Sequence, residues 1–398
     1  MKNNVSTFVH TGGDVERLSC PVCGKKNASE HKVMTRDYHG MRDIVPFAAY
    51  EVFACPECGM VYAGNMEVSM ELGEYYAKMS RYEGKSFVLS PKVQGLYARE
   101  AEFLAQHVSR EAKILDVGCA FGGLLGELRK KGFTNLYGLE PSAENAHYAK
   151  EHFGAIVHQG GLGMGTHLEE TFDLVILSAV LEHLLDLHAA VRELKSYLRP
   201  GGRLFFVVPE LADFPHHRDL YQEFSIEHIN YFSIPALKNL MRPFGFRLEA
   251  MMEDTTTLMG LAGNSFTLFT DGAEELQPAE PDFEALKQYL TNSQAVASAI
   301  RTKLQAKDFS QGFYIWAAGT QTAMLYQLGL FPQEAVRGIF DANRNLWGEE
   351  IFSLEVMSPE RLKDLPPLPV LISSAYAQEA IKKQMKEMAL ENPVWDIW

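Results

Sequence analysis

The feature that most constrains this chain is an apolar run ending in the pattern Asp-x-Gly-x-x-x-Gly, which is formed by Asp116, Gly118 and Gly122. A helix-like segment follows, and a second apolar run, residues 136–140, ends in the carboxylate of Glu140. This order predicts a strand, a glycine turn, a helix and a second strand. Glycines let the backbone of such a turn approach a ligand at the helix N-terminus. Glu140 is placed to accept hydrogen bonds from the two hydroxyls of a ribose.

Apolar segments alternate with helix-like segments through the middle of the chain. They predict an α/β fold with a parallel sheet and helices on both faces. Two further strands, residues 246–249 and 266–270, would complete the sheet, the last one antiparallel. Ligands of such sheets gather at the carboxyl ends of the strands. The expected parallel strands are residues 113–118, 136–140, 155–159, 172–179 and 203–209.

The glycine spacing differs from the Gly-x-Gly-x-x-Gly of dinucleotide folds and resembles motif I of class I S-adenosylmethionine-dependent methyltransferases. The segments 181–183 (Leu-Glu-His) and 198–202 (Leu-Arg-Pro-Gly-Gly) resemble later motifs of that family. The resemblance implies S-adenosylmethionine as the methyl donor. Cys119, inside the turn, is interpreted as small packing beside the cofactor. The expected cofactor-binding residues are Asp116, Gly118, Cys119, Gly122, Glu140, Pro141, Gly161, Leu162, Ser178 and Leu181.

Four of the five cysteines form two Cys-x-x-Cys-Gly knuckles, Cys20 with Cys23 and Cys55 with Cys58. This spacing holds thiolate pairs at the right separation for tetrahedral zinc. Redox pairs or disulfides are the alternatives, and neither predicts two matched knuckles. Four thiolates leave no position for a catalytic water, so we expect a structural zinc in a zinc-ribbon-like module.

A length of 398 residues predicts two or three domains. We expect a zinc-binding module at residues 1–68, a methyltransferase domain with an N-terminal helical segment at 69–271, and a linker helix with a Rossmann-like C-terminal domain at 272–398. The last domain shows strand-like runs from residue 313, at 336–341 and at 369–374. Its glycine pattern is incomplete for a dinucleotide, and a substrate phosphate near Gly319 and Thr320 is more plausible.

The formal net charge of −14 argues against a broad nucleic-acid surface. No apolar run approaches the length of a membrane span, and the first residues lack the apolar core of a signal peptide. We therefore expect a cytoplasmic protein with a small substrate, no nucleic-acid or membrane partner, and a monomeric or homodimeric state.

An insertion between strand five and the last two strands is rich in titratable and aromatic side chains, among them Glu227 and His228. A neutral imidazole suits a general base near pH 7, and an adjacent carboxylate can orient it. The alternative is an ordinary surface pair before a helix capped by Ser233. Upstream, Tyr75, Tyr76 and Tyr82 either pack in a core or place hydroxyls in a cleft.

The order of modules, the cysteine knuckles and the segment Glu227-His228-Ile229-Asn230-Tyr231-Phe232-Ser233 resemble the sugar C-methyltransferases that act on nucleotide-linked 4-keto deoxysugars. The resemblance covers nearly the whole chain. It implies that His228 removes a proton from the carbon beside the ketone, and that the resulting enolate attacks the methyl group. Glu227, His183 and a tyrosine at Tyr76 or its neighbour Tyr75 would hold the sugar and stabilise the enolate.

This chain has Ser225 where that family usually has tyrosine. A single lost donor near a developing charge is worth a few kcal/mol, so an O- or N-methyltransferase acting on a nucleotide sugar or glycan precursor is the alternative. An RNA methyltransferase is disfavoured by the acidic charge and by Ser178-Ala179-Val180-Leu181, which stands where an Asn-Pro-Pro-Tyr-type motif would be. A binding module without catalysis is disfavoured by the intact Asp116, Gly118 and Glu140.

Overall fold

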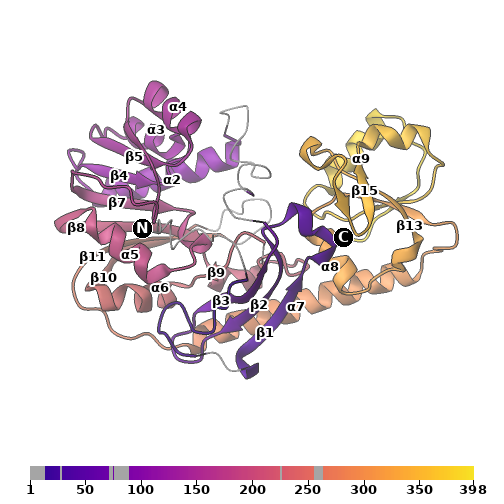
Figure 1. Cartoon of the computed structure of the whole chain (residues 1–398), viewed down its shortest axis with the longest axis horizontal. Helices are drawn as coiled ribbons and strands as arrows, with labels where there is room; N and C mark the ends of the chain where they lie inside the picture. The colour runs from indigo at the N-terminus through magenta and orange to yellow at the C-terminus, as the bar shows by residue number, and fades with distance from the viewer. Residues whose placement is uncertain (1–13, 27–28, 71–74, 76–88, 225, 255–262) are drawn as a thin grey trace, which may run out of the picture.

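The computed structural model describes residues 14–26, 29–70, 75, 89–224, 226–254 and 263–398, and within them the strands form three β-sheets. Figure 1 shows the seven-stranded sheet at one end, the C-terminal sheet at the other and the N-terminal sheet between them. The long helix α7 (Glu280–Gln305) runs along one side and connects the first sheet to the last.

The seven-stranded sheet has the strand order β10-β11-β8-β7-β4-β5-β6. Five neighbouring strands are parallel, and β11 is antiparallel to both β8 and β10. The predicted strands are confirmed, although β8 begins earlier than expected, at the segment before the Pro-Gly-Gly turn. The strands are β4 (Ile114–Val117), β5 (Leu136–Glu140), β6 (Ile156–Gln159), β7 (Phe172–Ser178), β8 (Leu198–Pro209), β10 (Phe246–Asp254) and β11 (Asn264–Asp271).

Helices cover both faces of this sheet, as the sequence predicts. Because side chains alternate along a strand, Leu115 and Val117 of β4 pack in one core and Ile114 packs in the other. The first core is completed by α5 (Leu187–Ser196) and α6 (Ile234–Met241), and the second by α2 (Pro91–His107), α3 (Gly123–Lys130) and α4 (Ala143–Phe153).

Side-chain caps define where several of these helices begin. Ser90, Ser142 and Asp186 accept hydrogen bonds from backbone N–H groups in the first turns of α2, α4 and α5. Ser233 does the same for α6, where its Oγ accepts from the N–H of Ala236 at 3.1 Å. The predicted cap is therefore confirmed, and each cap satisfies a donor that the helix leaves unpaired.

The N-terminal sheet has the order β1-β2-β3-β9 and is antiparallel. Its first three strands are β1 (Lys32–Asp37), β2 (Phe47–Ala54) and β3 (Val61–Val68), and its fourth is β9 (Asn230–Tyr231). Strand β9 comes from the insertion between β8 and β10, and Val61 pairs with Tyr231. The sheet therefore crosses the predicted boundary at residue 68.

The C-terminal sheet follows the order β14-β15-β13-β12-β16-β17, and β14 is antiparallel to β15. The predicted strand, turn and helix are present as β12 (Phe313–Trp316) and α8 (Thr320–Gln327). The aromatic end of the chain docks within the molecule, since Trp395 is buried and β17 pairs with β16. The other elements are β13 (Val336–Phe340), β14 (Glu350–Ile351), β15 (Leu354–Met357), β16 (Val370–Ile372), β17 (Val394–Trp395) and α9 (Gln378–Glu387).

Short 3-10 helices occur in all three parts. They are η1 (Ser29–His31), η2 (His39–Ile44), η3 (Leu181–His183), η4 (Leu211–His216), η5 (Arg242–Phe244), η6 (Gln333–Ala335), η7 (Arg344–Leu346) and η8 (Pro359–Asp364).

Candidate active site

The glycine turn follows β4 and leads into α3. Gly118 and Gly122 have φ values of +77° and +88°, a backbone region that favours glycine. A Cβ at Gly122 would lie 2.8 Å from the Cβ of Ala149, so the turn packs too closely against α4 for a side chain. The N–H of Gly118 donates to the carbonyl of Leu139 at 2.8 Å, which joins the turn to β5.

Glu140 ends β5 and lies beside this turn. One carboxylate oxygen accepts from the N–H of Ala120 at 3.0 Å, and the other accepts from the N–H of Ser142 at 2.9 Å. Its carbonyl accepts from the N–H of Gly160 at 3.0 Å, which brings the end of β6 to the same place. The predicted ribose acceptor is therefore held firmly at the carboxyl edge of the sheet.

Asp116 lies in β4, two residues before Gly118, and its side chain is buried. Burial, and then the negative charge of Glu140, raise the pKa of the Asp116 carboxyl to about 7. Cys119 packs closely against β5, because a Cβ at Gly138 would lie 2.5 Å from its Sγ, and its place beside the cofactor stays a prediction. The two carboxyl groups and the turn thus form one compact group at the ends of β4 and β5.

The remaining residues predicted to bind the cofactor differ in exposure. Pro141 is exposed and Leu162 is buried, while Gly161 lies near Met164. The hydroxyl of Ser178 donates to Glu100 of α2 at 3.2 Å, and the Leu181 side chain is buried in the core. Their contact with a cofactor stays a prediction.

Two histidines meet beyond the ends of β7 and β8. His183 ends η3, His228 precedes β9, and their ring centroids are 4.9 Å apart at an interplanar angle of 79°. The Nδ1 of His183 is 2.9 Å from the carbonyl oxygen of Glu227, and because a carbonyl oxygen can only accept, Nδ1 is the donor of this hydrogen bond. Burial and the neighbouring His183 lower the pKa of His228 to about 3, which keeps its imidazole neutral.

Glu227 joins this pair to the upstream tyrosines. Its carboxylate accepts a hydrogen bond from the hydroxyl of Tyr75 at 2.7 Å, and Tyr75 is buried. The structure therefore brings together His228, Glu227, His183 and Tyr75. Tyr76 and Ser225 lie outside the described residues, so their predicted roles stay predictions.

Glu182 is a charged residue at this site that we did not predict. Its carboxylate lies 3.9 Å from His183 Nε2 and is buried, and its Oε2 has no hydrogen-bond partner among the residues that the structure describes. Burial raises the pKa of Glu182. The Leu-Glu-His motif was the available signal, but only the fold shows that the glutamate points toward the histidine pair.

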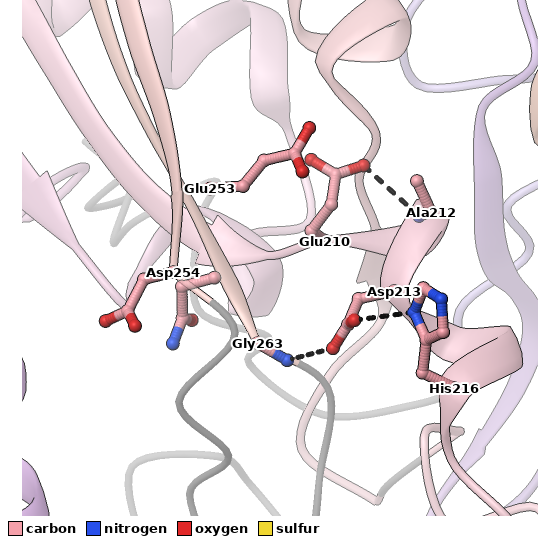
Figure 2. A pocket seen from close by; sticks show the side chains of 8 residues that line it. Glu210, Ala212, Asp213, His216, Glu253, Asp254 and Gly263 are labelled. Carbon is pink, nitrogen blue, oxygen red and sulfur yellow. Dashed lines mark hydrogen bonds and ion pairs between the residues drawn. The ribbon is translucent and has the colours of Figure 1, made fainter.

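A pocket opens at the same edge of the sheet, beyond β8 and β10 (Figure 2). Asp213 accepts from His216 Nδ1 at 2.9 Å, from His217 Nε2 at 2.8 Å and from the N–H of Gly263 at 2.6 Å. The insertion's other two histidines are thus bound to one carboxylate. The lining residues are Glu210, Ala212, Asp213, His216, Glu253, Asp254, Gly263 and Asn264.

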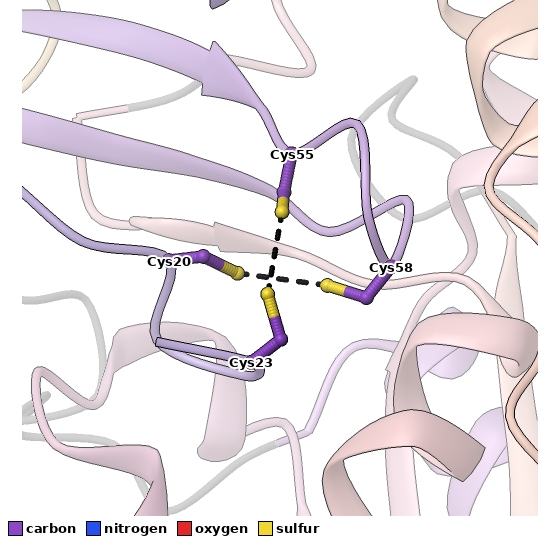
Figure 3. A group of neighbouring side chains, drawn as sticks. All are labelled: Cys20, Cys23, Cys55 and Cys58. Carbon is purple, nitrogen blue, oxygen red and sulfur yellow. Dashed lines mark hydrogen bonds between the residues drawn. The ribbon is translucent and has the colours of Figure 1, made fainter. Parts of the chain in front are cut away.

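The two cysteine knuckles face one another (Figure 3). The Sγ atoms of Cys20 and Cys58 are 3.6 Å apart, those of Cys23 and Cys55 are 3.4 Å apart, and all four lie within 4.8 Å. Tetrahedral zinc with Zn–S bonds of about 2.3 Å requires sulfur atoms about 3.8 Å apart, whereas a disulfide requires about 2.05 Å. The donor set therefore fits the predicted zinc.

Three features define the methyltransferase class of α/β domain. They are a seven-stranded sheet with one reversed strand, a glycine turn after the first strand, and an acidic residue at the end of the second strand. Residues 91–251 match the family model of a methyltransferase domain. The predicted enzyme class, an S-adenosylmethionine-dependent methyltransferase, is therefore confirmed for the central domain.

Among curated proteins, the chain is similar to the mitochondrial ubiquinone biosynthesis O-methyltransferase of Rattus norvegicus, with 28% identity over 173 residues, 39% of this chain and 48% of that protein. It is similar to the Homo sapiens protein of the same name, with 37% identity over 102 residues, 23% of this chain and 27% of that protein. The chain spans less than half the length of these relatives.

Among solved structures, the chain is similar to a Burkholderia thailandensis 1,6-didemethyltoxoflavin-N1-methyltransferase at 16% identity, a TM-score of 0.41 and coverage of 54% of this chain and 96% of that one. It is also similar to a magnesium protoporphyrin IX methyltransferase of Synechocystis at 16% identity, a TM-score of 0.38 and coverage of 50% and 94%. Across the described residues, no helix is both long and apolar enough to cross a membrane.

Proposed function

We propose that this protein transfers the methyl group of S-adenosylmethionine to the carbon beside the ketone of a nucleotide-linked 4-keto deoxysugar. The observation that carries the proposal is the histidine pair: His228 lies 4.9 Å from His183 between ring centroids, and Glu227 beside it is held by the hydroxyl of Tyr75. Proton removal next to a ketone needs a positioned base, and His228 with His183 and Glu227 beside it supplies a base with neighbours that can orient it.

The cofactor supplies an electrophilic methyl group, and Gly118, Gly122 and Glu140 are the residues that would hold it. His228 accepts the proton from the sugar carbon, and the electrons of the broken C–H bond move to the ketone oxygen as an enolate. With the cofactor bound, the enolate carbon would take the methyl group in line, and the electrons of the broken S–C bond would stay on the sulfur of S-adenosylhomocysteine. Positioning supplies much of the rate of such a transfer.

The low pKa of His228 affects the transfer of the proton from the sugar carbon in two ways. Its imidazole is fully available as a proton acceptor at neutral pH, but the imidazolium that forms is destabilised by burial and by His183. Glu182 and Glu227 are the nearby carboxyl groups that would stabilise it as the proton arrives. The proton-transfer step therefore depends on Glu182, which precedes His183, and on Glu227, which precedes His228.

The proposal extends to the other two parts of the chain. We propose that Cys20, Cys23, Cys55 and Cys58 hold a structural zinc. We also propose that the turn before α8 receives a phosphate of the nucleotide, because Gly319, the residue before that helix, provides no side-chain cap and no cap comes from the other described residues, so the first N–H groups of α8 could bind an anion.

The second candidate is transfer to oxygen or nitrogen of a nucleotide sugar or glycan precursor, with His228 removing the proton from a hydroxyl or amine. Two observations favour it. The relatives described above are named O-methyltransferases, and Ser225 stands where the sugar C-methyltransferases usually have tyrosine.

Methyl-labelled S-adenosylmethionine and a panel of nucleotide-linked 4-keto and fully hydroxylated sugars test the two candidates, with carbon NMR of the products. A methyl on ring carbon supports the enolate reaction, and a methyl on oxygen or nitrogen supports the second candidate. Transfer to no member of the panel contradicts both.

For the base, we expect His228→Asn to keep its affinity for the cofactor and to lose turnover by about 10²-fold or more, the usual contribution of a general base. His216→Asn is the matched control, because His216 is an exposed histidine of the same insertion and is bound to Asp213. Near-normal turnover of His228→Asn would move the base to another residue.

A further inference from the structure

The two catalytic histidines are tied together by a residue of the N-terminal unit, Arg17. Its side chain is buried among backbone carbonyls of three segments. NH1 donates to the carbonyl oxygens of Ala63 and Ile229, each at 3.3 Å, and NH2 donates to the carbonyl of Leu185 and the Oδ1 of Asn230, each at 2.9 Å. One guanidinium thus spans β3, the segment after His183 and the segment after His228.

Asn230 makes a second connection between the same two segments. Its Nδ2 donates to the carbonyl of Leu184 at 2.7 Å and lies 3.3 Å and 3.4 Å from the carbonyls of Leu181 and Glu182. These carbonyls belong to η3 and the residue after it, the turn that carries His183. The amide is buried, so each of these polar contacts is made away from water.

The positions of these acceptors matter because they flank the histidines. Leu185 is two residues after His183, and Ile229 directly follows His228. The N–H of Ile229 also donates to the carbonyl of Glu182 at 2.9 Å. The distance and angle between the two imidazoles are therefore set by backbone groups that Arg17 and Asn230 hold.

Arg17 itself is fixed by the N-terminal sheet. Val15 and Met66 form an antiparallel bridge, and a Cβ at Gly64 would lie 2.8 Å from the carbonyl oxygen of Arg17, so this segment lies directly on β3. The guanidinium carbon lies 5.5 Å from the ring centroid of Tyr62, also on β3. Three residues further along the chain is Cys20, the first cysteine of the four-cysteine cluster.

We propose that Arg17 and Asn230 are positioning residues for methyl transfer, through which the metal-binding N-terminal unit holds His183 and His228 in their working arrangement. This inference rests on the proposed function. It gives the N-terminal unit a part in turnover without placing its metal or any of its side chains at the reacting atoms. Small displacements of reacting groups are enough to cost turnover heavily.

Two variants test the inference while keeping the buried volume and the fold. Arg17→Lys keeps a buried cation but cannot span four acceptors, and Asn230→Asp keeps the acceptor for Arg17 while losing the donors to the turn of His183. Arg42→Lys is the control, since Arg42 is an exposed residue of the same unit that pairs with Glu67 at 2.6 Å.

For both test variants we expect kcat to fall about tenfold to a hundredfold. The affinity for S-adenosylmethionine by calorimetry and the zinc content stay at the wild-type values, and the pH profile of kcat/KM changes shape. Arg42→Lys stays within twofold of wild type in every measurement. Values of kcat within twofold of wild type in both Arg17→Lys and Asn230→Asp would overturn the inference.

A second readout does not depend on any substrate. In protein labelled with ¹⁵N-histidine, we expect Arg17→Lys to move the imidazole signals of His183 and His228 and to leave that of His216 unchanged. If the wild-type protein methylates nothing in the panel, the proposed function fails while this readout still measures the positioning. Unmoved signals of His183 and His228 would overturn the positioning itself.

Discussion

Asp116 is a buried carboxyl group with the negative charge of Glu140 nearby, and its pKa is raised from 3.8 to about 7. The folded protein therefore holds a proton that the unfolded chain releases above about pH 4. The contribution of this bound proton to the unfolding free energy is fully present below about pH 4 and is lost as the pH rises through 7. Because asparagine stays neutral, we expect the unfolding free energy of Asp116→Asn to rise relative to that of wild type by about 3 kcal/mol between pH 5 and pH 8.

Urea denaturation at four pH values across this range measures the difference. Glu144→Gln is the control, because Glu144 is an exposed carboxylate at the start of α4. If the unfolding free energies of Asp116→Asn and wild type changed with pH in parallel, Asp116 would already be ionised in the folded protein at pH 5.

Among single residues, the sequence motifs predicted the positions that depend on neighbours in the chain, such as Gly118 and Gly122 in the turn after β4 and Glu140 at the end of β5. Residues whose roles depend on distant contacts were not predicted. Arg17 and Ile229 are 212 positions apart in the chain, and only the fold brings them together. The choice between Tyr75 and Tyr76 was likewise open, and the structure shows Tyr75 bonded to Glu227.

Among the elements, the long apolar strands were predicted because their residues form continuous runs that parallel strands require when both faces are covered. Strands β9, β14 and β17 were not, since each has two residues and no periodicity to detect. Of these, β9 matters most, because it places the segment of His228 against the N-terminal sheet. A short strand whose partner lies far away in sequence leaves no local signal.

The loop between β2 and β3 depends on its cysteines. Cys55 and Cys58 lie in it, and the facing knuckle is closed by an antiparallel bridge between Ser19 and Lys26. We expect Cys55→Ser to bind clearly less than one equivalent of zinc and to lower Tm by several degrees, since metal-binding free energy adds to folding free energy. Metal analysis and thermal unfolding measure the two effects.

Cys119→Ala serves as the control for losing a cysteine, because Cys119 is buried in the glycine turn and belongs to neither knuckle. We expect it to keep a full equivalent of zinc. If Cys55→Ser also kept a full equivalent and an unchanged Tm, the four-cysteine cluster would not be a metal site.

At the scale of the whole molecule, the segment that leads to His228 is where the three parts of the chain meet. Tyr50 of β2 donates from its hydroxyl to the carbonyl of Phe224 at 3.0 Å. Thr320 of α8 donates to Gln222 at 2.7 Å. Figure 1 shows α7 running beside both the N-terminal sheet and the C-terminal part. The segment before His228 is therefore held by contacts from the N-terminal and C-terminal parts, so the position of His228 depends on how the parts are assembled.

Tyr289 of α7 is a side chain that tests this dependence. It is buried, its hydroxyl donates to Asp219 at 2.7 Å, and it accepts from the N–H of Glu223 at 3.0 Å. Tyr289→Phe leaves both groups without this partner, at a cost of about 1–3 kcal/mol. We expect a lower unfolding free energy of that size, a kcat reduced about tenfold and unchanged affinity for S-adenosylmethionine.

Tyr376→Phe removes the same hydroxyl from an exposed tyrosine of the C-terminal part, and we expect it to match wild type in denaturation and in kcat. Denaturation separates the stability effect from the catalytic one, because kcat is measured under conditions in which both variants are fully folded. A Tyr289→Phe protein that loses stability but keeps its kcat would mean that α7 supports the fold without setting the position of His228. A loss of both would place the helix among the elements on which turnover depends, although it lies outside the methyltransferase domain.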